Sequence, residues 1–315
     1  MFENIIGNEK IKQELVRTVS SNTNSHSYLF LGTVGIGKKL IAKEFSKMLL
    51  CDENALNNDF IDNERTGQYC NKCKSCIEFS SGNNPDFFMI EPEGNSIKIE
   101  QIREMQRKII EEPIISTRKV YIINDSDKMT KEAQNALLKT LEEPPKFVVI
   151  ILIGSNEDSF LVTIKSRCNI IRFNNIADDE IKRYLQQKFQ ISNIEDNMIK
   201  SLGGSIGKAE ILWEKRELYT AVYNLVSKIE KLDLIDMLKE ADIIYKSQED
   251  KFEILEYINV LLFEKSKVNI KFLKGIDIIE ETKRRLKANS NYNMCIDNML
   301  FSLWEEINFE KYSRN

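Results

Sequence analysis

Histidine is nearly absent from this 315-residue sequence, which contains a single one. That residue, His26, directly precedes the apolar segment Ser27–Leu31, and no second residue lies at the spacing of a catalytic partner. We interpret His26 as a packed or capping side chain at the entrance of a strand. The scarcity of histidine therefore argues against histidine-based chemistry.

Long apolar runs are also missing. No segment approaches the roughly 20 apolar residues that a membrane-spanning helix requires. The first seven residues carry an early charge and lack the long apolar region of a signal peptide. We therefore expect a cytoplasmic protein that does not associate with a membrane.

A strong excess of one charge is absent as well. The 45 Lys and Arg residues are balanced by 49 Asp and Glu residues, and the net charge is −4. The chain alone should therefore have no strong electrostatic affinity for nucleic acid. Its 42% apolar and 30% charged fractions describe an ordinary soluble protein, and its length is sufficient for two or three domains.

Cysteine is present, and its spacing is informative. Six cysteines lie at positions 51, 70, 73, 76, 168 and 295, and in a cytosolic chain a local cluster indicates metal before disulfide. Cys51, Cys70, Cys73 and Cys76 form the pattern C-x18-C-x2-C-x2-C, and four thiolates suit a closed, structural Zn²⁺ site. The assignment of Cys51 as the fourth ligand is weaker than that of the other three, because no local spacing rule demands it. Free thiols and an iron–sulfur cluster remain the alternatives.

The segment 32–39, GTVGIGKK, has the spacing of a phosphate-binding loop. It follows an apolar strand and opens a predicted helix, Leu40–Leu50, which is the context that such a loop requires. The pattern G-x-x-x-x-G-K-[ST] fits at every fixed position but the last, where Lys39 replaces the hydroxyl residue that normally holds Mg²⁺. The candidate phosphate-binding residues are Gly32, Gly35, Gly37, Lys38 and Lys39.

A second change falls on the same function. The apolar strand Lys119–Ile123 leads into the position where a P-loop ATPase places its Mg²⁺ carboxylate and its water-activating glutamate. Here these positions are Asn124, which lacks the negative charge, and Asp125, which is one methylene shorter than Glu. A strand-end turn with side-chain capping is an equally good interpretation of Asp125 and Asp127. Binding of ATP or ADP through the loop backbone is compatible with both changes, whereas hydrolysis is not expected.

Apolar periodicity predicts alternating strands and helices in the first half of the chain. The expected strands are Ser27–Leu31, Pro85–Ile90, Lys119–Ile123, Phe147–Ile153 and Ile170–Phe173, and the expected helices are Glu9–Val19, Leu40–Leu50, Ile99–Ile110 and Lys131–Glu142. This alternation predicts an α/β fold with a parallel sheet.

From Asp178 onward strand signals vanish, and a further boundary is expected near Trp213. We expect an α/β domain over residues 1–174 with a cysteine-containing insertion at 51–76, followed by helical regions at 175–213 and 214–315. The apolar stripe of the last region is expected to be bundle core; it comprises Phe252, Leu255, Ile258, Leu261 and Leu262.

These features together resemble the AAA+ proteins of the bacterial DNA polymerase III clamp loader. The resemblance rests on residues 136–145 (ALLKTLEEPP), the apolar strand after them, the motif Ser166-Arg167-Cys168, the cysteine insertion, and the segment His26–Phe30. It covers about residues 1–212. It implies an AAA+ P-loop module with helices on both faces of a five-stranded sheet of order 5-1-4-3-2, a helical lid at 175–213 and a C-terminal collar at 214–315.

Within that family the chain most resembles the delta-prime type of subunit, because it departs from the motor subunits at three catalytic features. Motor subunits (gamma/tau) have an intact loop, an Asp-Glu pair after the third strand and an arginine in a lid sensor. This chain has Lys38-Lys39, Asn124-Asp125 and GSIG at 204–207 in those places. The Ser-Arg-Cys motif, by which the family places an arginine in a neighbour's ATP site, is retained. The resemblance therefore implies that Arg167 acts in trans on ATP bound by a neighbouring subunit.

The resemblance also implies partners. The chain would be a component of the DNA polymerase III holoenzyme without its own ATPase activity, joined to motor (gamma/tau) and delta subunits in a pentameric ring. The ring would act on the sliding clamp and would hold primer-template DNA. Two alternatives remain open, an active motor subunit of the same loader and a zinc-dependent structural protein without a nucleotide role.

Overall fold

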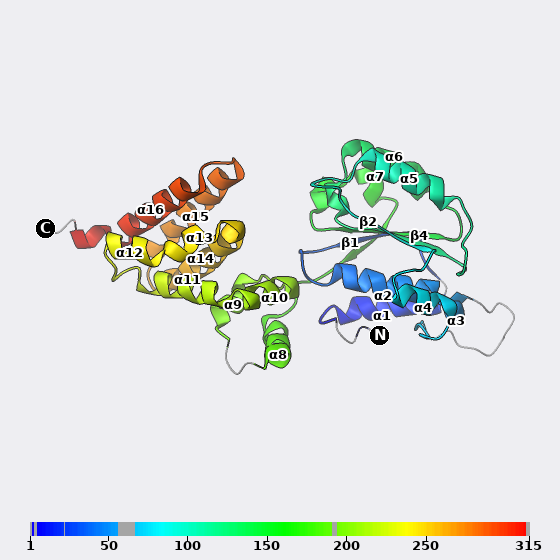
Figure 1. Ribbon diagram of the computed structural model, residues 1–315, viewed down its shortest axis with the longest axis horizontal. Helices are drawn as coiled ribbons and strands as arrows, with labels where there is room; N and C mark the ends of the chain where they lie inside the picture. Colours follow the sequence, from blue (N-terminus) through cyan, green and yellow to red (C-terminus); the bar gives the residue numbers. More distant parts are fainter. Residues whose placement is uncertain (1, 3–4, 22, 56–66, 191–193, 313–315) are drawn as a thin grey trace. The chain divides into compact units, whose positions relative to one another are not determined.

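The computed structural model describes residues 2, 5–21, 23–55, 67–190 and 194–312. The chain divides into two compact units, Met1–Glu180 and Ile181–Asn315 (Figure 1). The first unit contains the sheet and the second is helical. The finer division expected at residues 174 and 213 remains a prediction.

A five-stranded parallel sheet forms the centre of the first unit. Its strands are β1 (Ser27–Leu31), β2 (Phe87–Ile90), β3 (Lys119–Ile123), β4 (Val148–Gly154) and β5 (Asn169–Arg172). Their order, β2-β3-β4-β1-β5, confirms the expected order 5-1-4-3-2. Every residue of the inner strands β1, β3 and β4 is buried, because these strands are covered on both faces, whereas the edge strands are partly exposed.

Helices cover both faces of this sheet (Figure 1). On one face α1 (Glu9–Ser20) and α2 (Lys38–Leu50) share a core with Tyr28 and Phe30 of β1. On the other face α5 (Ile99–Ile109) and α6 (Lys131–Glu142) share a core with Leu29 and Leu31. Successive strand residues point to opposite faces, so one apolar run serves both cores. The predicted α/β fold class is confirmed.

Parallel pairing brings the carboxyl ends of the inner strands to one edge of the sheet. The loop 32–37 leaves β1 at this edge, the turn after Ile123 leaves β3, and Ser155 follows β4. The short elements of the unit are α3 (Asp52–Ala55), α4 (Lys74–Ser80), η1 (Ser126–Lys128), η2 (Glu157–Ser159) and α7 (Val162–Lys165). Residues 56–66, part of the insertion expected at 51–76, lie outside the described residues.

The second unit consists of helices. They are α8 (Asp178–Phe189, which begins at the end of the first unit), α9 (Asp196–Ser201), α10 (Ile206–Glu214), α11 (Arg216–Lys228), α12 (Leu234–Glu240), α13 (Asp242–Lys246), η3 (Gln248–Asp250), α14 (Lys251–Ser266), α15 (Lys271–Lys287) and α16 (Tyr292–Tyr312). Among the described residues, no helix is both long enough and apolar enough to cross a membrane.

Helix α15 packs against both α14 and α16. Four residues of the predicted apolar stripe on α14 are buried, namely Leu255, Ile258, Leu261 and Leu262, whereas Phe252 is only half-buried. Gly275 of α15 faces both neighbouring helices, since a Cβ atom there would lie 3.1 Å from Leu262 Cδ1 and 3.1 Å from Leu303 Cδ2. The glycine therefore permits this packing.

Candidate functional site

The phosphate-loop segment has a backbone that requires glycine. A Cβ atom on Gly32 would lie 2.6 Å from Ile36 Cδ1 and 3.0 Å from Phe173 Cβ, so no larger residue fits. Gly37, the residue before α2, has a φ of 91°, in the left-handed region that favours glycine. The loop thus leads directly into the N-terminus of α2, where unpaired N–H groups and the helix dipole favour an anion.

Lys38 is folded into this loop. Its Nζ donates to the carbonyl oxygens of Gly32 at 2.6 Å and Thr33 at 2.8 Å, and the residue is 7% exposed. Burial lowers the pKa of Lys38, and the negative charges of Asp127 and Asp125 partly offset that effect. Lys38 therefore lies inside the loop, at the position from which a P-loop lysine contacts phosphate oxygens.

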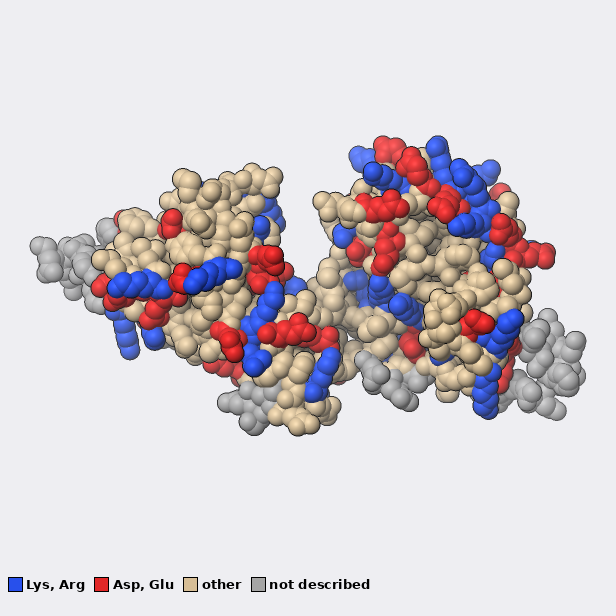
Figure 2. Space-filling model, viewed as in Figure 1, with Lys and Arg blue, Asp and Glu red and all other residues tan. Residues whose placement is uncertain are grey.

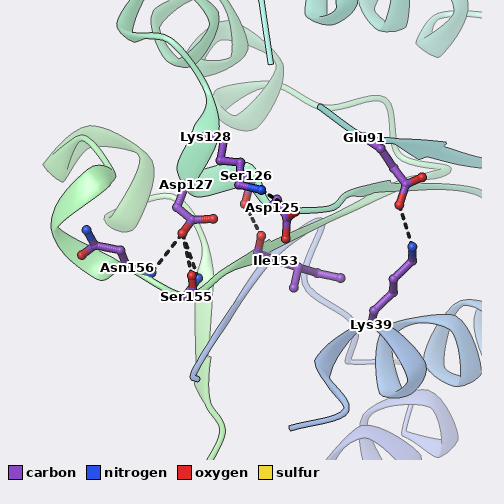
Figure 3. A network of polar contacts seen from close by, with 9 residues as sticks. All are labelled: Lys39, Glu91, Asp125, Ser126, Asp127, Lys128, Ile153, Ser155 and Asn156. Atoms are coloured by element: carbon purple, nitrogen blue, oxygen red, sulfur yellow. Dashed lines mark hydrogen bonds and ion pairs between the residues drawn. The ribbon is translucent and has the colours of Figure 1, made fainter. Parts of the chain in front are cut away.

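Lys39 points out of the loop toward the end of β2 (Figure 3). Its Nζ lies 2.6 Å from Oε1 of Glu91, which directly follows that strand. The hydrogen bond and the positive charge of Lys39 lower the pKa of the Glu91 carboxyl group. The residue that replaces the metal-binding hydroxyl is thus an ammonium group paired with a carboxylate.

The polar turn after β3 is held by contacts within the protein (Figure 3). Asn124 continues the backbone ladder by donating its N–H to Ile90 O at 2.9 Å. The next residue, Asp125, has a φ of 49° and lies 3.0 Å from Lys128 Nζ. Both positions predicted to correspond to the metal and water sites of an ATPase therefore lie at this edge of the sheet.

Asp127 has a different environment from Asp125. Its Oδ2 accepts hydrogen bonds from Ser155 N at 3.2 Å, Ser155 Oγ at 2.8 Å and Asn156 N at 3.1 Å. These bonds join the end of β3 to the end of β4. Asp127 therefore ties together two strand ends, which differs from the local capping of its own turn that the sequence suggests.

The residues around the loop do not fit a Mg²⁺ site. Mg²⁺ in a phosphate loop is held by a hydroxyl and a carboxylate in addition to phosphate oxygens. Lysine and asparagine occupy those two positions, and the nearby carboxylates of Asp125 and Glu91 are paired with lysine ammonium groups.

Arg167 is located away from the phosphate loop, between α7 and β5. Its Nη1 donates to Thr163 O at 2.9 Å, and its Nη2 lies 2.5 Å from Oε1 of Glu142, the last residue of α6. About a third of the Arg167 side chain is exposed (32%). The guanidinium is thus paired with Glu142 and partly exposed at the surface.

The four clustered cysteines come together. The Sγ atoms of Cys51, Cys70, Cys73 and Cys76 all lie within 4.8 Å of one another. Tetrahedral Zn²⁺ with Zn–S bonds of about 2.3 Å requires sulfur atoms about 3.8 Å apart, so the donor set fits zinc. Cys51, whose assignment rested on no spacing rule, belongs to the cluster because it lies at the C-terminus of α2.

Backbone N–H groups surround the cysteine sulfur atoms. Cys70 N donates to Cys51 Sγ at 3.4 Å, Cys73 N to Cys70 Sγ at 3.2 Å, and Cys76 N to Cys73 Sγ at 3.4 Å. The thiol of Cys76 donates to the sulfur of Cys51, which lowers the pKa of Cys51 to about 5. The same hydrogen bond raises the pKa of Cys76, and burial raises the pKa of Cys73, so without a metal ion the thiolate, the form that binds metal, is favoured at Cys51.

The segment 67–80, here called the cysteine module, is attached to α2, the helix that follows the phosphate loop. Tyr69 Oη donates to Glu44 Oε2 at 2.8 Å, and Lys47 Nζ donates to Asn71 Oδ1 at 2.6 Å and Ser80 Oγ at 2.9 Å. Both Glu44 and Lys47 belong to α2. The module thus braces the helix whose opposite end carries the loop.

In the region expected to be the lid, the segment 204–207 starts a helix. Ser205 is the N-cap of α10, and its side chain accepts a hydrogen bond from Lys208 N at 3.1 Å. Gly207 stands where the motor subunits of the family would carry an arginine. The segment therefore serves as a helix start and offers no cation at that position.

Sequence reasoning missed two partners of the candidate residues, Glu91 and Glu142. Glu91 directly follows the predicted strand Pro85–Ile90, and Glu142 lies within the motif ALLKTLEEPP. Their positions were visible in the sequence, but their pairing with Lys39 and Arg167 depends on how distant elements pack.

Comparison with known proteins finds that this chain is similar to subunits of DNA polymerase III. A family model described as "DNA polymerase III, delta subunit" matches residues 7–177. DNA polymerase III subunit tau/gamma of Haemophilus influenzae is 30% identical over 263 residues, 81% of this chain and 36% of the relative. DNA polymerase III subunit delta' of Bacillus subtilis is 33% identical over 191 residues, 61% of this chain and 51% of the relative.

These matches span about a third to a half of the length of the curated relatives. Among solved structures, a DNA polymerase III gamma-subunit-related protein from Thermotoga maritima matches with a TM-score of 0.53 and 20% identity. The match covers 94% of this chain and 99% of that one, and it shows a shared fold.

Proposed function

Because the chain belongs to the bacterial clamp-loader AAA+ family of DNA polymerase III, we propose that it is a delta-prime-like subunit of that loader. In this role the chain is a scaffold that does not itself hydrolyse ATP. It places Arg167 in the ATP site of a neighbouring motor subunit while the assembled ring loads the sliding clamp onto primed DNA.

The observation that carries this proposal is a contrast between two parts of the first unit. At the loop, lysine and asparagine replace both residues that would hold Mg²⁺, and Asp125 is paired with Lys128. At the surface, Arg167 is retained and is fixed by Glu142 without being buried. A chain that lacks its own hydrolytic groups but presents this arginine is suited to act on a neighbour.

Arg167 can change partners at small cost. An exposed ion pair contributes only about 0–1 kcal/mol. The γ-phosphate of ATP in a neighbouring subunit carries more negative charge than Glu142, so it can take over the guanidinium. Two N–H groups of Arg167 would then stabilise the charge that develops on the phosphate oxygens during hydrolysis.

The proposed partners are motor (gamma/tau) and delta subunits, and the sliding clamp is acted on by the ring. On the face drawn in Figure 2, Lys and Arg side chains are interspersed with Asp and Glu over each unit. This mixture and the net charge of −4 support contact with primer-template DNA through the assembled ring rather than through this chain alone.

A structural zinc ion belongs to the same proposal. Cys51, Cys70, Cys73 and Cys76 would hold it as four thiolates, which leaves no open position for water. The ion would fix the insertion against α2 and take no part in chemistry.

The second candidate function is an active motor subunit. The relatives named tau and gamma favour it, since the match to the Haemophilus influenzae protein spans 81% of this chain. The two candidates differ in one property, the turnover of ATP by the purified chain.

Reconstitution tests the proposal. Clamp loading is measured with candidate motor and delta subunits, with and without this chain, and we expect loading only when the chain is present. The purified chain alone should show no metal-dependent ATP turnover. Turnover that is abolished by Lys38→Ala would establish the motor function instead.

A further inference from the structure

Lys39 occupies a position with a specific chemical meaning. A hydroxyl at this position in a phosphate loop ligates the Mg²⁺ that bridges the β- and γ-phosphates. Here the side chain carries its own positive charge, and its ammonium lies 2.6 Å from Glu91 Oε1 (Figure 3). The loop thus provides a covalently attached cation at the place from which a metal ion is normally held.

The positive charge of Lys39 disfavours the binding of Mg²⁺ at this site. A metal ion next to Lys39 would experience like-charge repulsion, and the carboxylates of Asp125 and Glu91 are already paired with Lys128 and Lys39. The amide of Asn124 carries no charge to offset that repulsion.

The loop nevertheless retains what a polyphosphate needs. Gly32 and Gly37 permit the backbone conformation of the loop, Lys38 lies inside it, and the first turn of α2 has no acidic residue. The Lys39 side chain is 41% exposed and the Glu91 side chain is 52% exposed. An ion pair in such a position is readily exchanged for a more highly charged partner.

We propose that this loop binds a nucleoside triphosphate without Mg²⁺, and that Lys39 leaves Glu91 to take the place of the metal ion between the phosphates. Glu91 then competes with the nucleotide for Lys39. This inference goes beyond the role proposed for Arg167 and does not depend on it, because it concerns the chain's own loop.

Calorimetric titration of the full chain with ATP tests the inference, in buffer with EDTA and in buffer with excess MgCl₂. We expect wild-type binding in EDTA that is at least as tight as with Mg²⁺. Lys39→Thr, which restores the hydroxyl, should bind roughly tenfold more weakly in EDTA and should regain affinity when Mg²⁺ is added. Glu91→Gln should bind more tightly than the wild type by a factor of a few at low salt.

Lys43→Thr is the matched control, since Lys43 is an exposed lysine of the same helix and its loss changes the net charge equally. Its affinity should stay within about twofold of the wild type. A wild-type affinity that requires Mg²⁺, or a Lys39→Thr affinity equal to the wild type in EDTA, would overturn the inference. An absence of ATP binding in both buffers would also overturn it, and would leave the proposed function of Arg167 standing.

Discussion

Asp125 and Asp127 are two residues apart, but Asp125 contacts its own turn whereas Asp127 contacts a different strand end. Asp125 forms one ion pair with Lys128 in the same turn, at 3.0 Å, and both side chains are about half exposed. Asp127 accepts three hydrogen bonds from Ser155 and Asn156, which belong to a different strand end. At the level of single residues, the second acid therefore stabilises the edge of the sheet at which the loop lies.

We predict that Asp127→Ala lowers the free energy of unfolding by about 1–2 kcal/mol, because it removes three hydrogen bonds to a charged acceptor, although water can solvate the exposed donors of Ser155 and Asn156. Asp125→Ala is the matched control and should cost less than about 1 kcal/mol, as expected for an exposed ion pair. Urea denaturation followed by circular dichroism measures both. Equal losses in the two variants would contradict the assignment of Asp127 as the structural acid.

The sequence predicts the candidate residues Lys39 and Arg167 but not the carboxylates that pair with them. The loop spacing correctly drew attention to Lys38 and Lys39, because glycine and lysine positions in a phosphate loop follow from local backbone geometry. Nothing local indicates that Lys39 pairs with Glu91, 52 residues away, or Arg167 with Glu142. Those pairs depend on how α2 packs on the sheet and on how α6 packs against α7.

At the scale of elements, α2 connects the two candidate sites. The phosphate loop precedes its first residue, and Cys51 follows its last. The cysteine module is attached to the same helix through Glu44 and Lys47. Loss of the proposed zinc ion should therefore loosen the helix that positions the loop.

We predict that Cys51→Ser reduces the zinc content from one ion per chain to less than half an ion, because three thiolates bind more weakly than four. The melting temperature should fall by about 5–10 °C, corresponding to a loss of a few kcal/mol. Cys168→Ser is the control, since Cys168 lies outside the cluster. Full zinc content in Cys51→Ser would show that Cys51 is not a ligand.

The close packing of α14, α15 and α16 around Gly275 leads to a third prediction. Gly275→Leu inserts a side chain where even a Cβ atom lies 3.1 Å from Leu262 and Leu303, so it should destabilise the second unit by about 1–3 kcal/mol. The adjacent Lys274→Leu is the control, because Lys274 is 72% exposed. A Gly275→Leu variant as stable as this control would contradict the packing described for these helices.

At the scale of the whole molecule, the sheet was predictable and the arrangement of the helices was not. The sequence correctly indicates the bounds of strands Ser27–Leu31 and Lys119–Ile123, because inner strands buried on both faces leave uninterrupted apolar runs. It also indicates the bounds of helix Lys131–Glu142. In the helical half the long helices α11, α14 and α15 all bury apolar stripes, so periodicity reveals helices without showing which ones pack together. The division into lid and collar accordingly remains a prediction.

Three features of the chain as a whole support the proposal that it acts on a neighbouring subunit. Its charge is nearly balanced, lysine and asparagine stand where a P-loop ATPase holds its metal ion, and Arg167, about a third exposed, is paired with Glu142. We propose that Arg167 acts on ATP bound by another subunit.

Arg167→Ala in the reconstituted ring tests this claim most directly. We predict intact assembly on gel filtration and a sharp fall in DNA-stimulated ATP hydrolysis, since such arginines contribute about 10³- to 10⁵-fold at the site they serve. The control, Arg172→Ala, removes another exposed arginine, paired with Glu157 at 2.8 Å, and should leave the rate unchanged. A normal rate of hydrolysis in the assembled Arg167→Ala ring would contradict the account.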